Sequence, residues 1–443
     1  MFKAIFNIFL ILIICFSASG IPVNDSYFDL PKFNFNTIKN KQNNENNYTY
    51  NANIHDKFIY NPTNIEFTMS YGSNKENFNT NNSQIVVEIY KNDNLIKQYK
   101  GSKIVKNIYK DKNKVKYILD ISMENLNIKS GNYNIKIYSD AEKFSNIPPY
   151  KLSATYFSNA KYIGSKNNVD KKHMFITLFF PDKQAMYLVP ISRKIPYTRK
   201  PIGKTIKNLQ LGPKNTLGLS EGSPIPKILW KSIKGTTAII NLPSNADIYG
   251  STGSYIALYS LINSITSIYG VDSIQFLVDG KKRDFFFHGI EIKKPFYPNT
   301  LPKAYLTLET DTKKFLLVPV EINKQNIDIN DLIINIFNSL QKGYVNDYDM
   351  NYLTSTIPSN IRLIDFYIKE NILNINFSKE FLNAYENRDD LKKMMIDSIL
   401  YSFTSLPEVN KVFIKVEGKI INSFGDIDIS KPLFPPAFIN VEQ

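Results

Sequence analysis

The chain has a single cysteine in 443 residues, Cys15, and it lies inside an apolar segment near the N-terminus. The rest of the chain therefore has no disulfide, no thiolate metal site and no cysteine nucleophile. The three histidines, His55, His173 and His288, are far apart in the sequence and lack the spacing of a metal-binding pair. A glycine-rich phosphate loop is also absent. We therefore predict no catalytic residue, no metal site and no cofactor.

Arginine is scarce among the 54 basic residues, although the formal net charge is +14 and the pI is about 9.3. Arginine is the residue best suited to bidentate phosphate recognition, so its scarcity predicts no nucleic-acid partner. The abundance of lysine, asparagine, isoleucine and tyrosine also fits the codon bias of an AT-rich genome. The positive charge leaves peptidoglycan or an anionic membrane surface as alternative partners.

Long apolar runs are absent except at residues 4–16, which is shorter than the roughly 20 residues that span a bilayer. Small residues follow, with Gly20 as the last residue before the expected cleavage point, so residues 1–20 are predicted to be a secretory signal peptide. Two alternatives stay open: an uncleaved membrane anchor, and lipidation of Cys15, which is preceded by Ile14 where a small residue is usual. In each case the body of the protein is expected outside the cytoplasm.

The length predicts roughly three domains, and the sequence pattern changes along the chain. Residues 21–56 are rich in asparagine and are predicted to be a flexible linker. Residues 57–158 carry short alternating strands without a helical pattern, which predicts an all-β, immunoglobulin-like sandwich. A polar linker at 159–172 is followed by strands that alternate with helices, which predicts two α+β domains at 173–300 and 301–440.

An internal repeat is the strongest pattern in the sequence, and it relates residues 174–298 to residues 304–436. Seven segments match in the same order, which indicates duplication of one fold unit. The matched pairs are YLVPI (187–191) with LLVPV (316–320), the helical segments 201–212 and 328–343, SPIP (223–226) with STIP (355–358), AIINLPS (238–244) with LNINFSK (373–379), LYSLINSITS (258–267) with IDSILYSFTS (396–405), SIQFLVDGK (273–281) with KVFIKVEGK (411–419), and KPFYP (294–298) with KPLFP (431–435).

Most of the repeated apolar residues have the spacing expected of the buried face of a helix or strand. One apolar stripe recurs at helical spacing in both copies and is predicted to be buried: Leu258, Leu261, Ile262 and Ile265, then Ile396, Ile399, Leu400 and Phe403. Asp279-Gly280 and Glu417-Gly418 are predicted hairpin turns, because glycine supplies the positive φ that such turns need.

The order of these motifs resembles the GerMN domain of GerM-type sporulation and spore germination proteins. The first copy has the strand FITLFFPD (175–182), the helix end LQLGP (209–213) and the strand FLVDG (276–280) of that pattern. The second copy departs from it, since LQKG (340–343) lacks the proline and VEG (416–418) has glutamate. The resemblance covers about 265 residues, some 60% of the chain, and its motifs are structural.

The resemblance implies a non-enzymatic, exported scaffold that acts between the mother-cell and forespore membranes through protein contacts of tandem GerMN domains. The implied partners are envelope or sporulation-channel proteins, or a second copy of the chain. The alternative is an extracytoplasmic protein that binds peptidoglycan, with the sandwich as the binding module.

A cell-wall hydrolase is the remote alternative, and its candidate residues are defined only by type. The candidate nucleophiles are Ser220, Ser232, Ser251 and Ser254, and the candidate acids are Asp182, Asp272, Asp279 and Asp284. No GxSxG elbow surrounds any of the serines. Most of the acids stand at strand ends, where turn and capping roles are expected of aspartate.

Overall fold

The computed structural model describes residues 49–54, 58–59, 63–70, 82–91, 93–111, 114–121, 128–246, 250–322 and 327–442. The predicted signal segment with Cys15 and Gly20 lies outside these residues, as does His55. Among the described residues, no helix has both the length and the apolar character that crossing a membrane requires.

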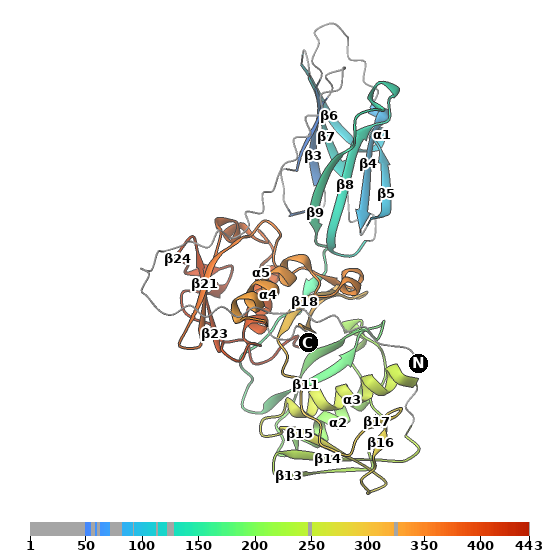
Figure 1. The fold of residues 1–443 in the computed structure, drawn as a ribbon, viewed down its shortest axis with the longest axis vertical. Helices are drawn as coiled ribbons and strands as arrows, with labels where there is room; N and C mark the ends of the chain where they lie inside the picture. Colours follow the sequence, from blue (N-terminus) through green and yellow to red (C-terminus); the bar gives the residue numbers. More distant parts are fainter. Residues whose placement is uncertain are drawn as a thin grey trace, which may run out of the picture. The chain divides into compact units, whose positions relative to one another are not determined.

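Two β-sheets face each other in the N-terminal part of the described chain (Figure 1). Neighbouring strands are antiparallel, except that the short β2 runs parallel to β9. A one-turn helix, α1 (Gly101–Ile104), joins β5 to β6. The first sheet has the order β1 (Thr49–Ile54), β3 (Thr63–Ser70), β7 (Lys114–Ile121), β6 (Val105–Asp111), and the second the order β2 (Phe58–Ile59), β9 (Tyr150–Tyr156), β8 (Gly131–Ser139), β4 (Ile85–Lys91), β5 (Asn94–Lys100).

Alternate side chains of these strands form one separate core. On β3 the inward residues are Ile65, Phe67 and Met69, each at most 1% exposed. This period of two is what a strand with one buried face requires. The residues thus form a two-sheet sandwich, and its immunoglobulin-like topology stays a prediction.

The prediction of a flexible linker over 21–56 is wrong at its C-terminal end, because Thr49–Ile54 form β1 and pair with β3 along their whole length. Tyr50 packs against Phe67 with ring centroids 5.3 Å apart, and Ala52 is buried. The hydrogen bonds between β1 and β3 and these buried contacts offset the low β-propensity of Asn51 and Asn53, which flank Ala52.

The rest of the chain contains the same sequence of elements twice (Figure 1). Each copy has a two-stranded hairpin, a helix, an antiparallel strand pair, a second helix and a strand parallel to its predecessor. The elements of copy one are β11 (His173–Pro181), β12 (Leu188–Pro196), α2 (Pro201–Leu211), β13 (Trp230–Lys234), β14 (Thr237–Leu242), α3 (Gly250–Thr266) and β15 (Ser273–Val278). The elements of copy two are β18 (Lys303–Glu309), β19 (Lys314–Glu321), α4 (Ile329–Lys342), β21 (Leu363–Lys369), β22 (Ile372–Phe377), α5 (Asp389–Phe403) and β23 (Lys411–Val416).

Shorter elements connect these units. The strands among them are β10 (Lys161–Tyr162), β16 (Phe285–Phe286), β17 (Ile290–Glu291), β20 (Leu353–Thr354), β24 (Lys419–Ile420), β25 (Ser423–Phe424) and β26 (Ile427–Asp428). Short 3-10 turns lie at η1 (Asn82–Gln84), η3 (Glu142–Phe144), η4 (Asn215–Leu217), η5 (Asp347–Asn351) and η6 (Lys379–Asn383).

Both copies contribute to one continuous hydrophobic core. The eight helix positions predicted from the repeated stripe are all buried, at 3% exposure or less. The glycines that end the first helix of each copy, Gly212 and Gly343, have φ of 76° and 81°. A Cβ at either position would collide with backbone atoms of the following segment, so backbone sterics require glycine there.

The polar stretch 159–172, predicted as a linker, is packed onto copy two. Lys161 and Tyr162 form β10, which runs parallel to β19. Tyr162 donates its hydroxyl hydrogen to Asp397 Oδ2 at 2.9 Å, and Arg388 Nη2 donates to the carbonyl oxygen of Ala160 at 2.7 Å. The chain between the sandwich and copy one therefore adds a strand to the hairpin sheet of copy two, whose order is β10-β19-β18-β20.

Candidate functional site

The serines considered as nucleophiles lie on three separate segments: Ser220 in the loop after η4, Ser232 on β13, and Ser251 and Ser254 on α3. Within the described chain, no hydrogen bond joins any of them to His288, which is exposed on a turn with φ of 58°. The structure therefore brings together no serine–histidine pair from these residues.

Most of the aspartates considered as paired acids already make hydrogen bonds or ion pairs within turns. Asp182 is 1% exposed, and its Oδ1 accepts the backbone N–H groups of Met186 and Tyr187, both at 2.7 Å. Asp279 accepts the backbone N–H of Ser244 at 3.2 Å, and Asp284 pairs with a lysine, while Asp272 stands just before β15. In the part of the chain that the structure covers, no cluster of three or more His, Cys, Asp or Glu could hold a metal ion.

The same turn is built in both copies from matched polar contacts. Asn241 Oδ1 accepts the backbone N–H of Gly280, and Asn376 Oδ1 accepts that of Gly418, both at 2.8 Å. Asp279 and Glu417 take positive φ angles of 48° and 47° in these turns. Glu417 Oε1 accepts a backbone N–H at 2.9 Å, as Asp279 does. The exchange of Asp for Glu between the copies thus preserves a structural role.

In both copies, a helix serine accepts a backbone N–H of the first strand of the hairpin. Ser264, on α3, accepts the backbone N–H of Phe179 on β11 at 2.9 Å. Ser402, on α5, accepts the N–H of Tyr305 on β18 at 2.8 Å. A strand edge leaves its N–H groups unpaired, and burying them without a partner is costly. The serines recurring in the two helices therefore serve packing, and none of these contacts points to catalysis.

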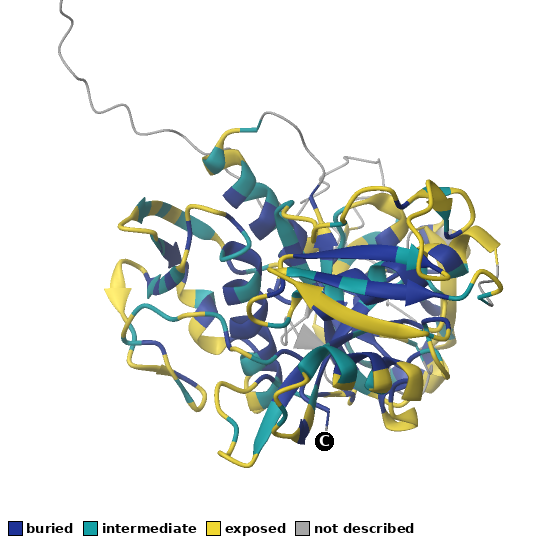
Figure 2. Cartoon of the chain, turned by 90° about the horizontal axis from the view of Figure 1, so that it is seen from below, coloured by how far each residue is buried: buried dark blue, intermediate teal, exposed yellow. Residues whose placement is uncertain are grey.

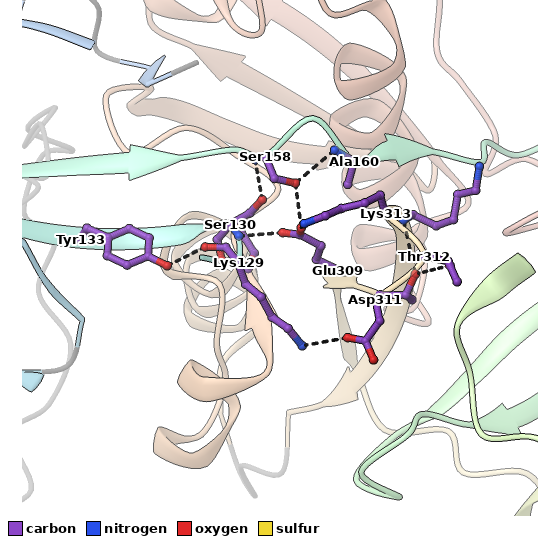
Figure 3. A network of polar contacts seen from close by, with 12 residues as sticks. Lys129, Ser130, Tyr133, Ser158, Ala160, Glu309, Asp311, Thr312 and Lys313 are labelled. Atoms are coloured by element: carbon purple, nitrogen blue, oxygen red, sulfur yellow. Dashed lines mark hydrogen bonds and ion pairs between the residues drawn. The ribbon is translucent and has the colours of Figure 1, made fainter. Parts of the chain in front are cut away.

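The sandwich is joined to copy two through a buried carboxylate, Glu309 (Figure 3). Glu309 is 3% exposed and ends β18. Its Oε2 accepts the backbone N–H of Ser130 at 2.6 Å, and its Oε1 accepts the hydroxyl of Ser158 at 2.7 Å. Lys313 Nζ lies 3.4 Å from Oε1. The charge is thus compensated by three donors, as a buried carboxylate requires.

All three structural units meet beside Glu309. Asp311 of copy two pairs with Lys183 of copy one at 3.1 Å and lies 3.9 Å from Lys129 of the sandwich. The residues around this point line a shallow pocket of about 10 Å³ that is open to solvent. Lys129 and Lys183 are both paired with Asp311, so the pocket is best described as a junction between units.

The C-terminal segment fastens the two copies together. Asn440 is fully buried, and its Nδ2 donates to the carbonyl oxygens of Pro190 on β12 and Leu317 on β19, at 2.9 and 2.7 Å. Its Oδ1 accepts the N–H of Leu317 at 2.9 Å. Two residues later, Glu442 makes a bidentate pair with Arg193, at 2.5 and 2.8 Å. One side chain thus bridges the hairpins of both copies.

Two buried acids stabilise contacts with tyrosine hydroxyls. Tyr187 of copy one donates to Asp349 of copy two at 2.5 Å. Burial raises the pKa of Tyr187, and the Asp349 carboxylate raises it further. Burial likewise raises the pKa of Asp397, which accepts from Tyr162 and lies 3.3 Å from Lys393. The tyrosines therefore stay protonated and act as hydrogen-bond donors.

The most exposed ordered strand in copy one is β13, the outer strand of the sheet β13-β14-β15 (Figure 2). All five of its residues are exposed, including Trp230 at 42% and Ile233 at 51%. Leu229, just before it, is 47% exposed. The corresponding edge of copy two, β21, is largely half-buried, with Tyr367 as its most exposed aromatic. Copy one therefore presents an open strand edge flanked by apolar side chains and lysines.

These features define a duplicated α+β protein in which the polar groups inside the core are structural and the distinctive surface is a strand edge. The family model described as "Germane: Sporulation and spore germination" matches residues 177–284 and 303–422. The two matches cover about half of the chain and fall within the two copies. The chain belongs to this family, which supports a sporulation-related role and is not a known enzyme family.

Three solved structures resemble parts of the chain. The tandem GerMN domains of the sporulation protein GerM from Bacillus subtilis are 19% identical, over 61% of this chain and 100% of that one, with a TM-score of 0.49. A protein from Clostridium perfringens described as a lipoprotein is 26% identical over 31% and 91%, with a TM-score of 0.21. The first GerMN domain of the same GerM is 18% identical over 31% and 95%, with a TM-score of 0.24. No curated protein matches the chain.

The interpretation from sequence missed Glu309, Asn440 and Trp230 as residues of interest. Glu309 and Asn440 acquire their roles from segments far away in the chain, 179 and 250 positions from Ser130 and Pro190. No local pattern marks such residues. Trp230 could have been singled out, because it is the only tryptophan and lies in the alternating run WKSIK.

Proposed function

We propose that the chain is an exported, non-enzymatic scaffold of sporulation or of the spore envelope. It acts between the mother-cell and forespore membranes through protein contacts of its tandem domains. The observation that carries this proposal is the open edge of β13, which exposes Trp230 and Ile233.

An exposed edge strand offers a row of unpaired N–H and C=O groups to a strand of another protein. Trp230 and Ile233 add apolar area beside this row, and tryptophan is the residue type most enriched at the centres of interfaces. Lys231 and Lys234 lie on the same strand, so a partner segment with acidic side chains fits it best. Among the described strands, β13 pairs only with β14, so its outer edge has no strand partner there.

The test is a fluorescent fusion of the full chain, followed through sporulation, with the double variant W230A/I233A. We expect the wild-type protein to concentrate at the membranes around the forespore and the variant to spread along the cell envelope. Both substituted side chains are exposed, so thermal unfolding should be unchanged. The matched control is Y367A, at the corresponding edge strand of copy two, which should localise as the wild type does. Normal localisation of W230A/I233A, together with normal spore formation, would overturn the proposal.

A further inference from the structure

We propose that residues 281–297 of copy one, here called the basic flap, form a docking surface for an anionic membrane. This surface is distinct from the β13 edge and does not depend on it. The flap follows β15 and includes β16 and β17. It contains five cations against two carboxylates: Lys281, Lys282, Arg283, Lys293 and Lys294, against Asp284 and Glu291.

The backbone of the flap is held firmly against the sheet. Lys281 forms a bridge with Val278, and Phe296 forms one with Ile274, so the flap covers the outer edge of β15. The rings of Phe287 and Phe296 pack on Phe276, with centroids 5.1 and 5.7 Å away. These anchors fix the flap in place, and its remaining side chains project from a rigid base.

The side chains not used as anchors combine aromatic and cationic character. Phe285 is 64% exposed and Tyr297 is 66% exposed. Lys293 pairs with Asp284 at 3.4 Å, whereas Lys281, Lys282 and Lys294 have no ion pair within 4.0 Å among the residues that the structure describes. Exposed rings beside unpaired lysines are the arrangement of proteins that bind the surface of a bilayer.

The corresponding segment of copy two shows that the fold does not require this character. Residues 419–434 contain two lysines and two aspartates, and Lys431 pairs with Asp428 at 3.6 Å. Phe434, the counterpart of Tyr297, is covered on one face by Lys411, whose Nζ lies 4.5 Å from the ring centroid. Both segments close the sheet by the same bridge, to Ile274 in copy one and to Val412 in copy two. Phe434 is still 62% exposed, close to the 66% of Tyr297. The excess of positive charge and the exposed ring of Phe285 are therefore what is specific to copy one.

The side-chain types favour a lipid surface over a protein or a wall polymer. Four of the five cations are lysines, which act as point charges and suit the diffuse field of anionic headgroups more than bidentate phosphate recognition. Phe285 has no polar group, so its exposed ring gains only by entering an apolar layer. A hydrated glycan would satisfy the lysines and leave Phe285 in water.

The test places a reporter on the flap of the full chain. In the variant W230F/F285W the only tryptophan lies on the flap, so its emission reports the flap alone, whatever the N-terminal segment does. The matched control is W230F/F434W, with the reporter at the corresponding segment of copy two. Vesicles of phosphatidylglycerol, vesicles of phosphatidylcholine and purified cell walls are added in turn. We expect a blue shift with phosphatidylglycerol only, and only for the flap reporter.

The charge requirement is tested by adding K281Q/K294Q to the flap reporter. Since each lysine near an anionic surface contributes about 1 kcal/mol, the lipid concentration for half-maximal shift should rise roughly thirtyfold. The substitutions K419Q/K431Q at the equivalent positions of copy two should leave this lipid concentration nearly unchanged. Equal shifts at positions 285 and 434, a shift with phosphatidylcholine, or a response to cell walls without one to lipid would each overturn the proposal.

Discussion

The two copies of the repeat share one core and differ at their surfaces. Copy two is covered on its hairpin by β10 and β20, and the sandwich is attached to it through Glu309. Copy one keeps a two-stranded hairpin, an open edge at β13 and the basic flap. Two kinds of polar contact inside each copy match, those of the helix serines and those of the turn asparagines. Of the two copies, copy two therefore makes the contacts to the sandwich, whereas copy one keeps its strand edge and its flap exposed.

The largest effect is expected where the copies are joined. The substitution N440A removes three buried hydrogen bonds and leaves backbone groups of Pro190 and Leu317 without partners, so the free energy of unfolding should fall by on the order of 3 kcal/mol. Asn440 also has φ of 46°, a conformation that alanine disfavours. Urea unfolding measures the loss.

The control for this variant is N371A. Asn371 has φ of 58° on the β21–β22 turn but is exposed and does not bridge the copies. It should lose about 1 kcal/mol, from backbone strain and from one exposed hydrogen bond of Asn371 Nδ2 to the carbonyl oxygen of Glu408 at 3.1 Å. If N440A lost no more than N371A, the bridge between copies would contribute nothing and the shared core would suffice.

An intermediate effect tests whether the copies are energetically alike. The substitutions S264A and S402A each leave one partly buried strand N–H without its acceptor, so each should cost about 1.5 kcal/mol. Ser260 provides the control, since it is on the same helix and buried, and its Oγ has no hydrogen-bond partner. S260A should therefore be neutral or slightly stabilising. Clearly unequal losses from S264A and S402A would show that the hairpin edges are held by different means.

The smallest effect concerns a buried acid found only in copy two. Burial raises the pKa of Asp397, so the native state binds its proton more readily than the unfolded chain does. Stability should therefore fall as pH rises from the ordinary aspartate range of 3.8 through the raised value. At neutral pH, D397N should be more stable than the wild type by roughly 1 kcal/mol.

The control is D390N, on the same helix, because the pKa of Asp390 is shifted in the opposite direction. Burial also disfavours ionised Asp390, but the hydrogen bond and charge of Arg388 outweigh it and lower its pKa. Its contribution is present above the ordinary aspartate range and is lost as pH falls through the lowered value. Thermal unfolding from pH 3 to 8 should give opposite pH trends for D397N and D390N. Parallel trends would mean that Asp397 is ionised at no cost in the native state.

The repeat and its core could be predicted because they rest on local patterns. Helical spacing of Leu258, Leu261 and Ile262, and alternation on the strands, depend only on residues a few positions apart. The glycine of each turn follows from a backbone angle that glycine alone adopts easily. The same reasoning failed for the segment 49–54, whose asparagines suggested a linker, because strand pairing with β3 outweighed local propensity.

By itself the sequence determined that one α+β unit occurs twice, which faces of its helices and strands are buried, and that the second copy tolerates glutamate in place of aspartate in a turn. The tertiary structure alone decided that Glu309 joins the sandwich to copy two, that Asn440 bridges the hairpins, and that β13 is left open. Burial and hydrogen-bond partners at these positions come from segments up to 250 residues away. Such pairings depend on how whole elements pack in space, and local sequence patterns do not predict them.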